Sequence, residues 1–424
     1  MAGQTATLIL VSIVLLVIDY YIFNGLKSAL KKRFLHSKQF SFLYWGISFA
    51  LIAGIFLSIF FRLGVGTRSA ILLIFFLILV GKILLLPFLF IDDIRRWVIW
   101  LKRRNVSSKQ PVVNNQIKQN AIPRSEFLIK AGLLAGALPI ASLAYGTIKG
   151  VYDYRLQRVT LYLPNLPKKF DGLTLGQISD LHAGSFQHSK EPAMGVEMLM
   201  REKPDLIFFT GDLVNDRAYE MKDYQDIFSR VKAPLGVYSS LGNHDYGDYS
   251  YDWLPGEKEK NHQDLINIHK NMGWELLRNE NRRIKVDGEE IGILGCENWG
   301  LLSRFKKYGN MEQTAKNTDD LPVKLLLSHD PSHWQAQVVA HYPQIDATFA
   351  GHTHGMQFGV RTKEFQWSPI EYVYKEWAGL YHQGKQQLYV NVGYGFLGYP
   401  GRLGILPEIT IFTLKSGVAP GNFA

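Results

Sequence analysis

The sequence predicts a mixed α/β domain with two β-sheets flanked by helices, preceded by an all-α transmembrane region. Two observations support this prediction. Long, almost unbroken apolar runs fill the first 95 residues, whereas after residue 150 short apolar strands alternate first with helical patterns and later with one another. We therefore expect three membrane spans in residues 1–95, a basic linker and a fourth span in residues 96–150, and a separate α/β domain in residues 151–424.

The N-terminal apolar runs have the length and the basic flanks of membrane helices. A helix needs about 20 apolar residues to cross the hydrocarbon core of a bilayer. Residues 40–61 and 69–91 meet that length, and residues 8–23 form a shorter run with tyrosines suited to the membrane interface. A fourth run, residues 127–148, contains a lysine and a proline, and we expect it to cross the membrane as well.

Positive charge is concentrated in this membrane region. Residues 1–150 carry 18 Lys and Arg against 4 Asp and Glu, whereas residues 151–424 carry 29 against 33. Basic residues beside apolar spans set membrane orientation, so they indicate no specific nucleic-acid partner. The loops after the first and third runs hold most of these charges, which predicts that both loops are cytoplasmic. In a multi-pass protein of the cytoplasmic membrane, the α/β domain is then extracytoplasmic if the fourth run crosses and cytoplasmic if it does not.

Two charged residues, Asp19 and Lys82, lie inside otherwise apolar runs. Such side chains are costly in lipid unless they pair, face the interior of the bundle or extend toward the interface. Each is near one end of its span, which favours extension toward the interface. The one cysteine of the sequence, Cys296, excludes an intramolecular disulfide, and its apolar surroundings predict a small buried hydrophobic side chain.

Short elements with clear boundaries follow residue 150. Prolines, glycines and an Asp-Gly pair separate the apolar runs, as turn residues do. Helices and strands alternate at first and paired strands accumulate later, which is typical of an α/β domain with two sheets. Expected strands are residues 159–163, 173–179, 205–210, 235–240, 274–277, 283–286, 291–296, 323–328, 347–349, 387–391 and 408–414; expected helices are residues 189–202, 219–231, 265–272 and 332–341.

Five polar motifs come directly after apolar strands. Loops at the carboxyl ends of strands converge on one crevice, so these side chains are expected to meet there. Their carboxylate, amide and imidazole groups are the oxygen and nitrogen ligands that two divalent metal ions require, and the lack of thiolate leaves Mn, Fe and Zn open. The motifs are Asp180-Leu181-His182, Gly211-Asp212, Gly242-Asn243-His244-Asp245, His329 and Gly351-His352-Thr353-His354.

The order of these motifs resembles that of the calcineurin-like metallophosphoesterase superfamily over residues 172 to about 414, and the Gly-His-Thr-His-Gly form is similar to its membrane-anchored bacterial branch. The resemblance implies a metallophosphoesterase sandwich, with two β-sheets flanked by helices. It also implies two metal sites that share Asp212 as a bridging ligand. The first would be formed by Asp180, His182, Asp212 and His354, and the second by Asp212, Asn243, His329 and His352.

The resemblance further implies a reaction. A hydroxide bridging the two metals would attack phosphorus in line, because two metals lower the pKa of bound water and stabilise the displaced oxygen. His244 would stabilise the phosphoryl oxygens or protonate the leaving group, and Asp245 would orient His244.

Other residues near the motifs are candidates for supporting roles. Asn215 and Asp216 follow the bridging aspartate closely enough to support the ligands. Arg402 is a candidate contact for a substrate phosphate. Two aromatic segments, residues 246–262 and 365–381, come after metal-ligand motifs and are candidates for lining a pocket or touching lipid.

The sequence therefore predicts a dinuclear metal-dependent phosphoesterase in a multi-pass membrane protein. Because the anchor holds the site near lipid, we expect a phosphodiester or pyrophosphate bond in a membrane or envelope molecule, with a lipid-linked phosphate ester and membrane lipid as partners and the oligomeric state left open. One alternative is a cytoplasmic-facing hydrolase of a nucleotide-linked lipid precursor. Another is a non-catalytic, metal-containing membrane sensor, which would not need His244 and Asp245.

Overall fold

The computed structural model describes residues 2–30, 33–61, 65–105, 124–250, 252–362 and 364–418. Contacts divide the chain into two compact units, Met1–Ala144 and Tyr145–Ala424. The first is helical and the second contains the strands, so each unit is described by itself below.

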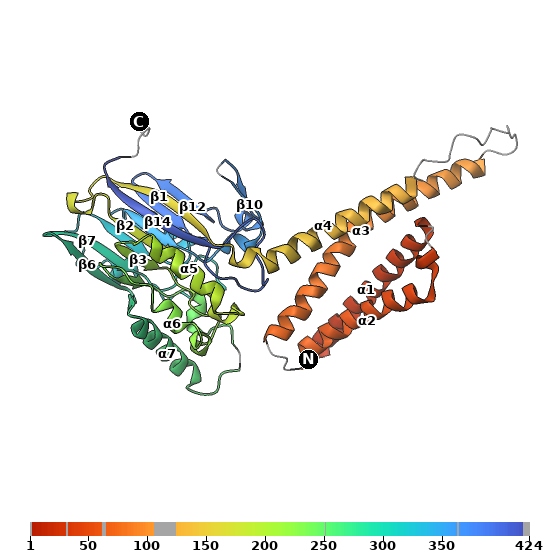
Figure 1. Ribbon diagram of the computed structural model, residues 1–424, viewed down its shortest axis with the longest axis horizontal. Coiled ribbons are helices and arrows are strands. Elements are labelled where there is room, and N and C mark those ends of the chain that lie inside the picture. Colours follow the sequence, from red (N-terminus) through yellow and green to blue (C-terminus); the bar gives the residue numbers. More distant parts are fainter. Residues whose placement is uncertain are drawn as a thin grey trace. The chain divides into compact units, whose positions relative to one another are not determined.

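Four long helices fill the N-terminal part of the chain, shown from red to yellow in Figure 1: α1 (Ala2–Ala29), α2 (Lys38–Phe60), α3 (Val65–Asn105) and α4 (Arg124–Ile148). Among the described residues, all four are long and apolar enough to cross a membrane. The fourth apolar run therefore forms one continuous helix. Helix α3 extends past the predicted span to Asn105, so the first part of the predicted linker is helical, and residues 106–123 lie outside the described residues.

Helices α3 and α4 approach each other closely at two glycines. A Cβ atom on Gly136 would lie 2.7 Å from the carbonyl oxygen of Gly81, so a larger residue there would force the helices apart. Small residues permit this contact in lipid, where van der Waals packing rather than water exclusion holds helices together. A buried apolar cluster that includes Ile22, Leu89 and Ile129 joins α1, α3 and α4.

Asp19 of α1 and Lys82 of α3 form an ion pair, so the prediction that they extend toward the interface is wrong. The Lys82 Nζ lies 2.6 Å from Asp19 Oδ1, and the hydroxyl of Tyr44 on α2 donates to the same oxygen at 3.2 Å. Asp19 is buried. A charge inside an apolar bundle is less costly when it is paired and hydrogen-bonded, which favours pairing over extension to the interface.

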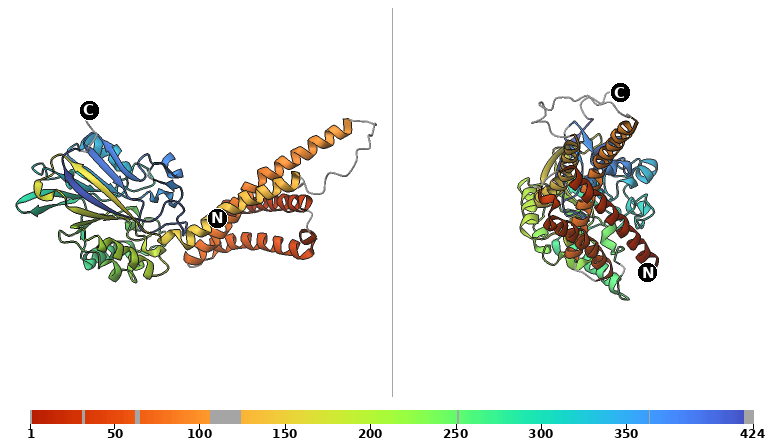
Figure 2. Two further views of the ribbon diagram at one scale, coloured as in Figure 1. Left: turned by 45° about the horizontal axis from the view of Figure 1, so that its top comes forward. Right: turned by 90° about the vertical axis from the view of Figure 1, so that its right-hand side faces the viewer.

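Two six-stranded sheets form the body of the second unit (Figure 1, Figure 2). The first has the order β1-β14-β2-β3-β4-β5 and the second the order β12-β13-β9-β8-β7-β6. The strands of the first sheet are β1 (Arg155–Leu163), β2 (Thr174–Ile178), β3 (Leu206–Phe209), β4 (Val237–Ser239), β5 (Glu275–Leu276) and β14 (Glu408–Ser416). Those of the second are β6 (Glu280–Val286), β7 (Glu289–Gly295), β8 (Lys324–Leu327), β9 (Ala347–Ala350), β12 (Gly379–Gln383) and β13 (Gln386–Val390).

Short helices and one small hairpin complete this unit. The hairpin pairs β10 (Val360–Arg361) with β11 (Gln366–Trp367). The helices are α5 (Lys190–Arg201), α6 (Gln225–Phe228), α7 (Glu257–Met272), α8 (Met311–Thr314) and α9 (Val339–His341), the last preceded by a π-helical turn, Trp334–Val338.

Strand β3 shows how one strand serves two layers of core. Leu206 and Phe208 belong to the apolar core between the sheets, whereas Ile207 and Phe209 belong to the core beneath helices α5, α6 and α7. Successive side chains of a strand point to opposite faces, so a strand covered on both sides is apolar throughout. The predicted architecture of two sheets flanked by helices is confirmed.

Several elements differ from the sequence prediction, among them α8 and the hairpin of β10 and β11, which were not predicted, and the expected helix at residues 332–341, which is a π-helical turn followed by the short α9. The expected helix at residues 219–231 is a 3-10 turn, Ala218–Met221, followed by the short α6, and the side chain of Glu220 in that turn accepts hydrogen bonds from the preceding loop. Helix α7 begins eight residues before the expected start because its first turns are charged and lack apolar periodicity. The edge strand β12 was not predicted, since its partly exposed residues lack a buried-strand pattern.

The carboxyl ends of five parallel strands carry the polar motifs. Strands β2, β3 and β4 of the first sheet run parallel, as do β8 and β9 of the second. Each ends two to four residues before a predicted ligand. The fold therefore delivers all of these loops to the same edge of the sandwich.

His269 of α7 makes stability depend on pH. It is fully buried, its Nδ1 lies 3.0 Å from the Ser239 hydroxyl, and burial lowers its pKa to about 3. An unfolded chain protonates histidine below about pH 6.5, whereas the folded chain keeps His269 neutral. The folded state is therefore fully stabilised above that pH and loses stability as the pH falls from 6.5 toward 3, by up to about 1.4 kcal/mol per pH unit.

We expect His269→Gln to flatten this acid slope of the free energy of unfolding between pH 6 and 4. The measurement is denaturant unfolding of the purified chain at several pH values. His341→Gln, which alters an exposed histidine of α9, is the control and should keep the original slope. An unchanged slope in His269→Gln would show that other groups cause the acid sensitivity.

Candidate metal centre

The motif loops bring the predicted ligands together in two groups at one edge of the sandwich. In each group, one potential ligand atom per residue lies within 4.8 Å of the others. The first group contains Asp180, His182 and His354; the second contains Asp212, His329 and His352. The two groups together contain every ligand that the resemblance implies except Asn243.

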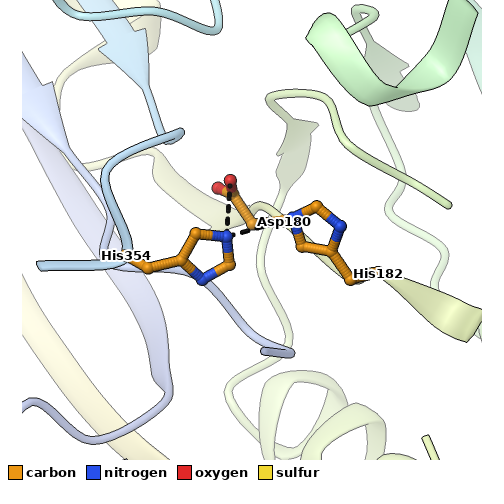
Figure 3. A group of neighbouring side chains, drawn as sticks. All are labelled: Asp180, His182 and His354. Atoms are coloured by element: carbon orange, nitrogen blue, oxygen red, sulfur yellow. Dashed lines mark hydrogen bonds and ion pairs between the residues drawn. The ribbon is translucent and has the colours of Figure 1, made fainter. Parts of the chain in front are cut away.

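The first group is drawn in Figure 3, where its three side chains point toward one another. The Nε2 atom of His354 lies 3.0 Å from Nε2 of His182 and 3.3 Å from Oδ1 of Asp180. Two nitrogens at right angles on one ion, each ~2.1 Å from it, are ~3.0 Å apart. The spacing of the group therefore fits a single transition-metal ion.

Asp212 lies between the two groups. Its Oδ2 is 3.0 Å from Nε2 of His329 in the second group and 3.6 Å from Nε2 of His182 in the first. Its other oxygen, Oδ1, accepts the backbone N–H of His244 at 2.8 Å. One carboxylate oxygen is thus within reach of both groups.

Asn243 faces the same cleft with an unused acceptor. Its Nδ2 donates to the hydroxyl of Tyr249 at 2.8 Å, whereas its buried Oδ1 has no hydrogen-bond partner in the described part of the chain. Leaving a buried acceptor unpaired costs about 1–3 kcal/mol. A cation at this oxygen would remove that cost, so the donor set fits divalent metal ions.

Hydrogen bonds from neighbouring residues fix the orientation of two ligand rings. The Nδ1 atom of His329 lies 2.7 Å from the carbonyl oxygen of Thr210, and Nδ1 of His182 lies 3.1 Å from Oδ1 of Asn215. A proton on Nδ1 leaves Nε2 of each ring free to bind a metal. The expected support by Asn215 is therefore present.

The main chain of Asp216 hydrogen bonds with Glu220 and Asn261, and its carboxylate interacts electrostatically with His244 and Asp212. The expected support of the ligands by Asp216 stays a prediction.

Tyr374 and Asp330 orient His352, which the sequence did not reveal. The Tyr374 hydroxyl lies 2.9 Å from Nε2 of His352 and 3.3 Å from Oδ2 of Asp330. This contact leaves Nδ1 as the ring nitrogen available to a metal. Asp330 is adjacent to His329 in the sequence and Tyr374 belongs to the second aromatic segment, but no spacing links the two positions.

His244 and Asp245 have different surroundings from those expected. The imidazole of His244 lines the cleft, and its Nδ1 lies 2.6 Å from the carbonyl oxygen of Asn215. The buried Asp245 carboxylate accepts the N–H groups of Asp212, Leu213 and Gly242 at 2.8–2.9 Å. The prediction that Asp245 orients His244 is therefore wrong: Asp245 holds the loop of Asp212, and a backbone carbonyl orients His244.

The backbone at the centre is strained. Five of the predicted ligands have positive φ angles, between 46° and 73°: Asp180, His182, Asp212, His352 and His354. Each such residue costs roughly 1–3 kcal/mol, and such residues cluster at functional sites. Gly351, which precedes His352, has to be glycine because a Cβ atom there would overlap the carboxylate of Asp180.

Opposite charges keep the two buried carboxylates ionised and burial keeps His182 neutral, and these are the protonation states that bind metals. Burial acts to raise the pKa of Asp180 and of Asp212, but His354 and His329 outweigh it and lower both pKa values. Burial lowers the pKa of His182, which favours the neutral ring. Burial also acts on His329, but the adjacent Asp212 carboxylate outweighs it and raises the pKa of His329 to about 10. A cation would compete with that proton for the same carboxylate.

Arg402 is not a substrate contact, so that prediction is wrong. Its side chain is fully buried, and its guanidinium donates to the carbonyl oxygens of Gly395 at 2.6 and 2.9 Å and of Val392 at 2.9 Å. Its Nη2 also lies 3.1 Å from Nδ1 of His354. Arg402 therefore ties a backbone loop to the outer edge of a predicted ligand ring.

The ligand groups open into a cleft of about 330 Å³. Tyr249 and Tyr374 line it, so each aromatic segment contributes one tyrosine to the wall. Tyr246, by contrast, stacks on Tyr308 with ring centroids 3.8 Å apart and supports the neighbouring loop. Phe305 and Arg304, which no sequence pattern singled out, also line the cleft.

Comparison with known proteins supports a metallophosphoesterase domain preceded by a transmembrane region. A family model described as a probable calcineurin-like phosphoesterase transmembrane domain matches residues 5–151, and the calcineurin-like phosphoesterase model matches residues 173–356. A transmembrane protein with a metallophosphoesterase domain from Danio rerio is 27% identical over 374 residues, covering 86% of this chain and 78% of the relative. The uncharacterized metallophosphoesterase YkuE of Bacillus subtilis is 29% identical over 305 residues, covering 69% of this chain and 98% of the relative.

Among solved structures, the sulfate thiohydrolase SoxB of Thermus thermophilus matches with a TM-score of 0.35 and 11% identity, over 59% of this chain and 57% of that one, a likeness too low to support inference. The assignment rests on the two matching domains together with the motif geometry. The chain carries a calcineurin-like phosphoesterase domain in residues 173–356, preceded in residues 5–151 by a segment that matches the transmembrane domain of probable calcineurin-like phosphoesterases.

Proposed function

We propose that this membrane protein hydrolyses a phosphodiester or diphosphate bond in a membrane or envelope molecule, using two divalent ions and a hydroxide derived from water. The main support is the position of Asp212 Oδ2, within 3.6 Å of a ligand nitrogen in each of the two groups. When bound, two divalent ions lower the pKa of water and neutralise the charge that develops on the phosphoryl group.

The side chains of the cleft position the substrate, and one of them can donate a proton to it. With Nδ1 held by the carbonyl oxygen of Asn215, Nε2 of His244 is the nitrogen free to act in the cleft. It is suited to donate a hydrogen bond to a phosphoryl oxygen or a proton to the leaving oxygen. The ring also contacts His182 of the first group, with ring centroids 4.9 Å apart, which limits its movement.

The presence of membrane helices favours the proposal that the substrate is itself bound to the membrane. The domain is joined to four apolar helices, so its cleft stays attached to the bilayer. The distribution of Lys and Arg, together with a fourth apolar helix, favours an extracytoplasmic domain.

The activity is tested with the full-length protein in lipid nanodiscs, stripped of metal and reloaded with Mn²⁺ or Zn²⁺. We expect metal-dependent hydrolysis of bis(p-nitrophenyl) phosphate in preference to p-nitrophenyl phosphate. Asp212→Asn and His244→Ala should each lower kcat at least about 100-fold, because they remove the shared carboxylate and the proton donor. Asp226→Asn and His382→Ala are the matched controls.

Two bound metals without turnover on any phosphate ester would favour a sensor. Metal analysis showing no bound ion would contradict the dinuclear centre.

Arg402→Met should weaken metal binding by about 10- to 100-fold, because residues that orient ligand rings have effects of this size. The measurement is competition for Zn²⁺ with a chromogenic chelator. Arg361→Met is the control, since Arg361 is a partly buried arginine whose partner is Glu408 rather than a ligand. Equal weakening in both variants would indicate general destabilisation rather than positioning of His354.

Orientation is tested with single cysteines in intact cells. Lys222→Cys in the second unit should react with a membrane-impermeant maleimide, and Lys38→Cys, at the first residue of α2, should not. Native Cys296 gives little background because it is fully buried. An unreactive Lys222→Cys would place the domain in the cytoplasm and favour the nucleotide-linked precursor. If Lys38→Cys is unreactive as well, the fourth apolar helix does not cross the membrane.

A further inference from the structure

The loop between β7 and α8 places a cation at the wall of the cleft. Phe305 packs edge-on against the ring of His352 with centroids 4.8 Å apart, and the guanidinium of Arg304 lies 4.6 Å from the centre of the Phe305 ring. Arg304 and Phe305 both line the cleft that contains Asp212 and His244. The charge of Arg304 is thus about one aromatic ring away from a predicted metal ligand.

The other cations of this loop already have partners. Lys306 binds the carboxylate of Asp248 at 2.8 Å, and Lys307 lies 4.0 Å from the centre of the Trp299 ring. Within the described ranges, no carboxylate lies within 4.0 Å of the exposed Arg304 guanidinium. An arginine without an acidic partner at a cleft wall is available to an anionic ligand, and its planar donors suit phosphate.

A second cavity adjoins the cleft at this point. It has a volume of about 130 Å³ and shares Asn243, Tyr249 and Arg304 with the cleft. The one carboxylate that lines it belongs to Asp248, which is neutralised by Lys258 and Lys306 and also accepts the Tyr308 hydroxyl at 2.8 Å. The cavity therefore carries a net positive charge.

We propose that Arg304 is a specificity-determining residue that binds a second phosphate, so that the substrate is a diphosphate ester. This inference rests on the proposed function and narrows it from phosphodiesters in general to diphosphates. The scissile phosphate occupies the cleft beside Asp212 and His244. The second phosphate is held by Arg304 at the junction with the smaller cavity.

The reaction balances as a simple hydrolysis. The oxygen of water forms a new bond to the scissile phosphorus, and the bond from that phosphorus to the bridging oxygen breaks. The bridging oxygen leaves with the second phosphate, which becomes a monoester, and a water proton passes to it or to solvent. Arg304 stabilises the negative charge that this leaving phosphate gains. A diester with a single phosphate has no second phosphate at this position, so Arg304 gives it no such stabilisation.

The experiment compares two substrates in nanodiscs: bis(p-nitrophenyl) phosphate and the symmetrical bis(p-nitrophenyl) diphosphate, with products separated by chromatography. Arg304→Ala should lower kcat/KM for the diphosphate by about 10- to 100-fold, since a charge-assisted hydrogen bond contributes on that scale. It should change kcat/KM for the single-phosphate diester by less than about twofold. Arg304→Lys, which keeps the charge without the planar donors, should be intermediate.

Lys307→Ala is the matched control, because Lys307 belongs to the same loop but lines neither cavity. It should behave as the parent protein on both substrates. Equal losses on the two substrates in Arg304→Ala would overturn the proposal, since Arg304 would then act on the scissile group or on folding.

A binding measurement separates this proposal from the proposed function. Titration calorimetry with methylenediphosphonate and methylphosphonate gives the preference of the metal-loaded protein for a second phosphate. We expect Arg304→Ala to lose that preference while binding the same amount of metal. If the parent protein hydrolyses neither substrate, the proposed function fails. Loss of the binding preference in Arg304→Ala would still support the second-phosphate site. A preference retained in Arg304→Ala would overturn it.

Discussion

The carboxylate of Asp212 is the interaction on which the rest of the centre depends. One of its oxygens lies beside ligand rings from both groups, and the other accepts the backbone N–H of His244. The backbone of Asp212 is in a left-handed conformation, and its N–H is held by the buried carboxylate of Asp245. Two strand ends and two ligand groups are therefore fixed through one side chain, and any shift of that loop moves both groups together.

Burial of so much charge is tolerated because the charges compensate one another. Carboxylates and imidazoles alternate across the centre, and the outer nitrogen of several rings contacts a carbonyl or amide oxygen. Polar networks of this kind fix one geometry when each member has a partner. Asn243 Oδ1 is a member without a partner in the described part of the chain, and a cation bound there would supply one.

Much of the centre could be predicted from sequence because its ligands come directly after strands. An apolar run that ends in Asp-x-His or Gly-His-x-His fixes both the element and the place of the polar group, and parallel strands then bring distant motifs to one edge. The supporting contacts could not be predicted in the same way. His244 is oriented by a backbone carbonyl, which every residue possesses and which leaves no pattern in the sequence.

Long-range pairs and irregular loops account for the remaining differences. Asp19 and Lys82 are on different helices, so their pairing depends on how the bundle packs rather than on local pattern. Arg304 is in a loop without periodicity, and its place at the cleft is visible only once the loop is folded. Arg402 was expected to contact a substrate phosphate, but its guanidinium is buried against the carbonyl oxygens of Val392 and Gly395, and backbone carbonyls leave no pattern in the sequence.

The last turn of α4 sets the boundary of the second unit. Gly146 accepts the backbone N–H of Arg402 at 3.2 Å, and a Cβ atom on Gly150 would overlap the Arg402 carbonyl oxygen. The domain thus begins at Tyr145, inside the apolar helix and not after it. A soluble fragment cut at residue 150 would deprive the Arg402 amide of its acceptor, so truncation for crystallisation has to keep part of the hydrophobic helix.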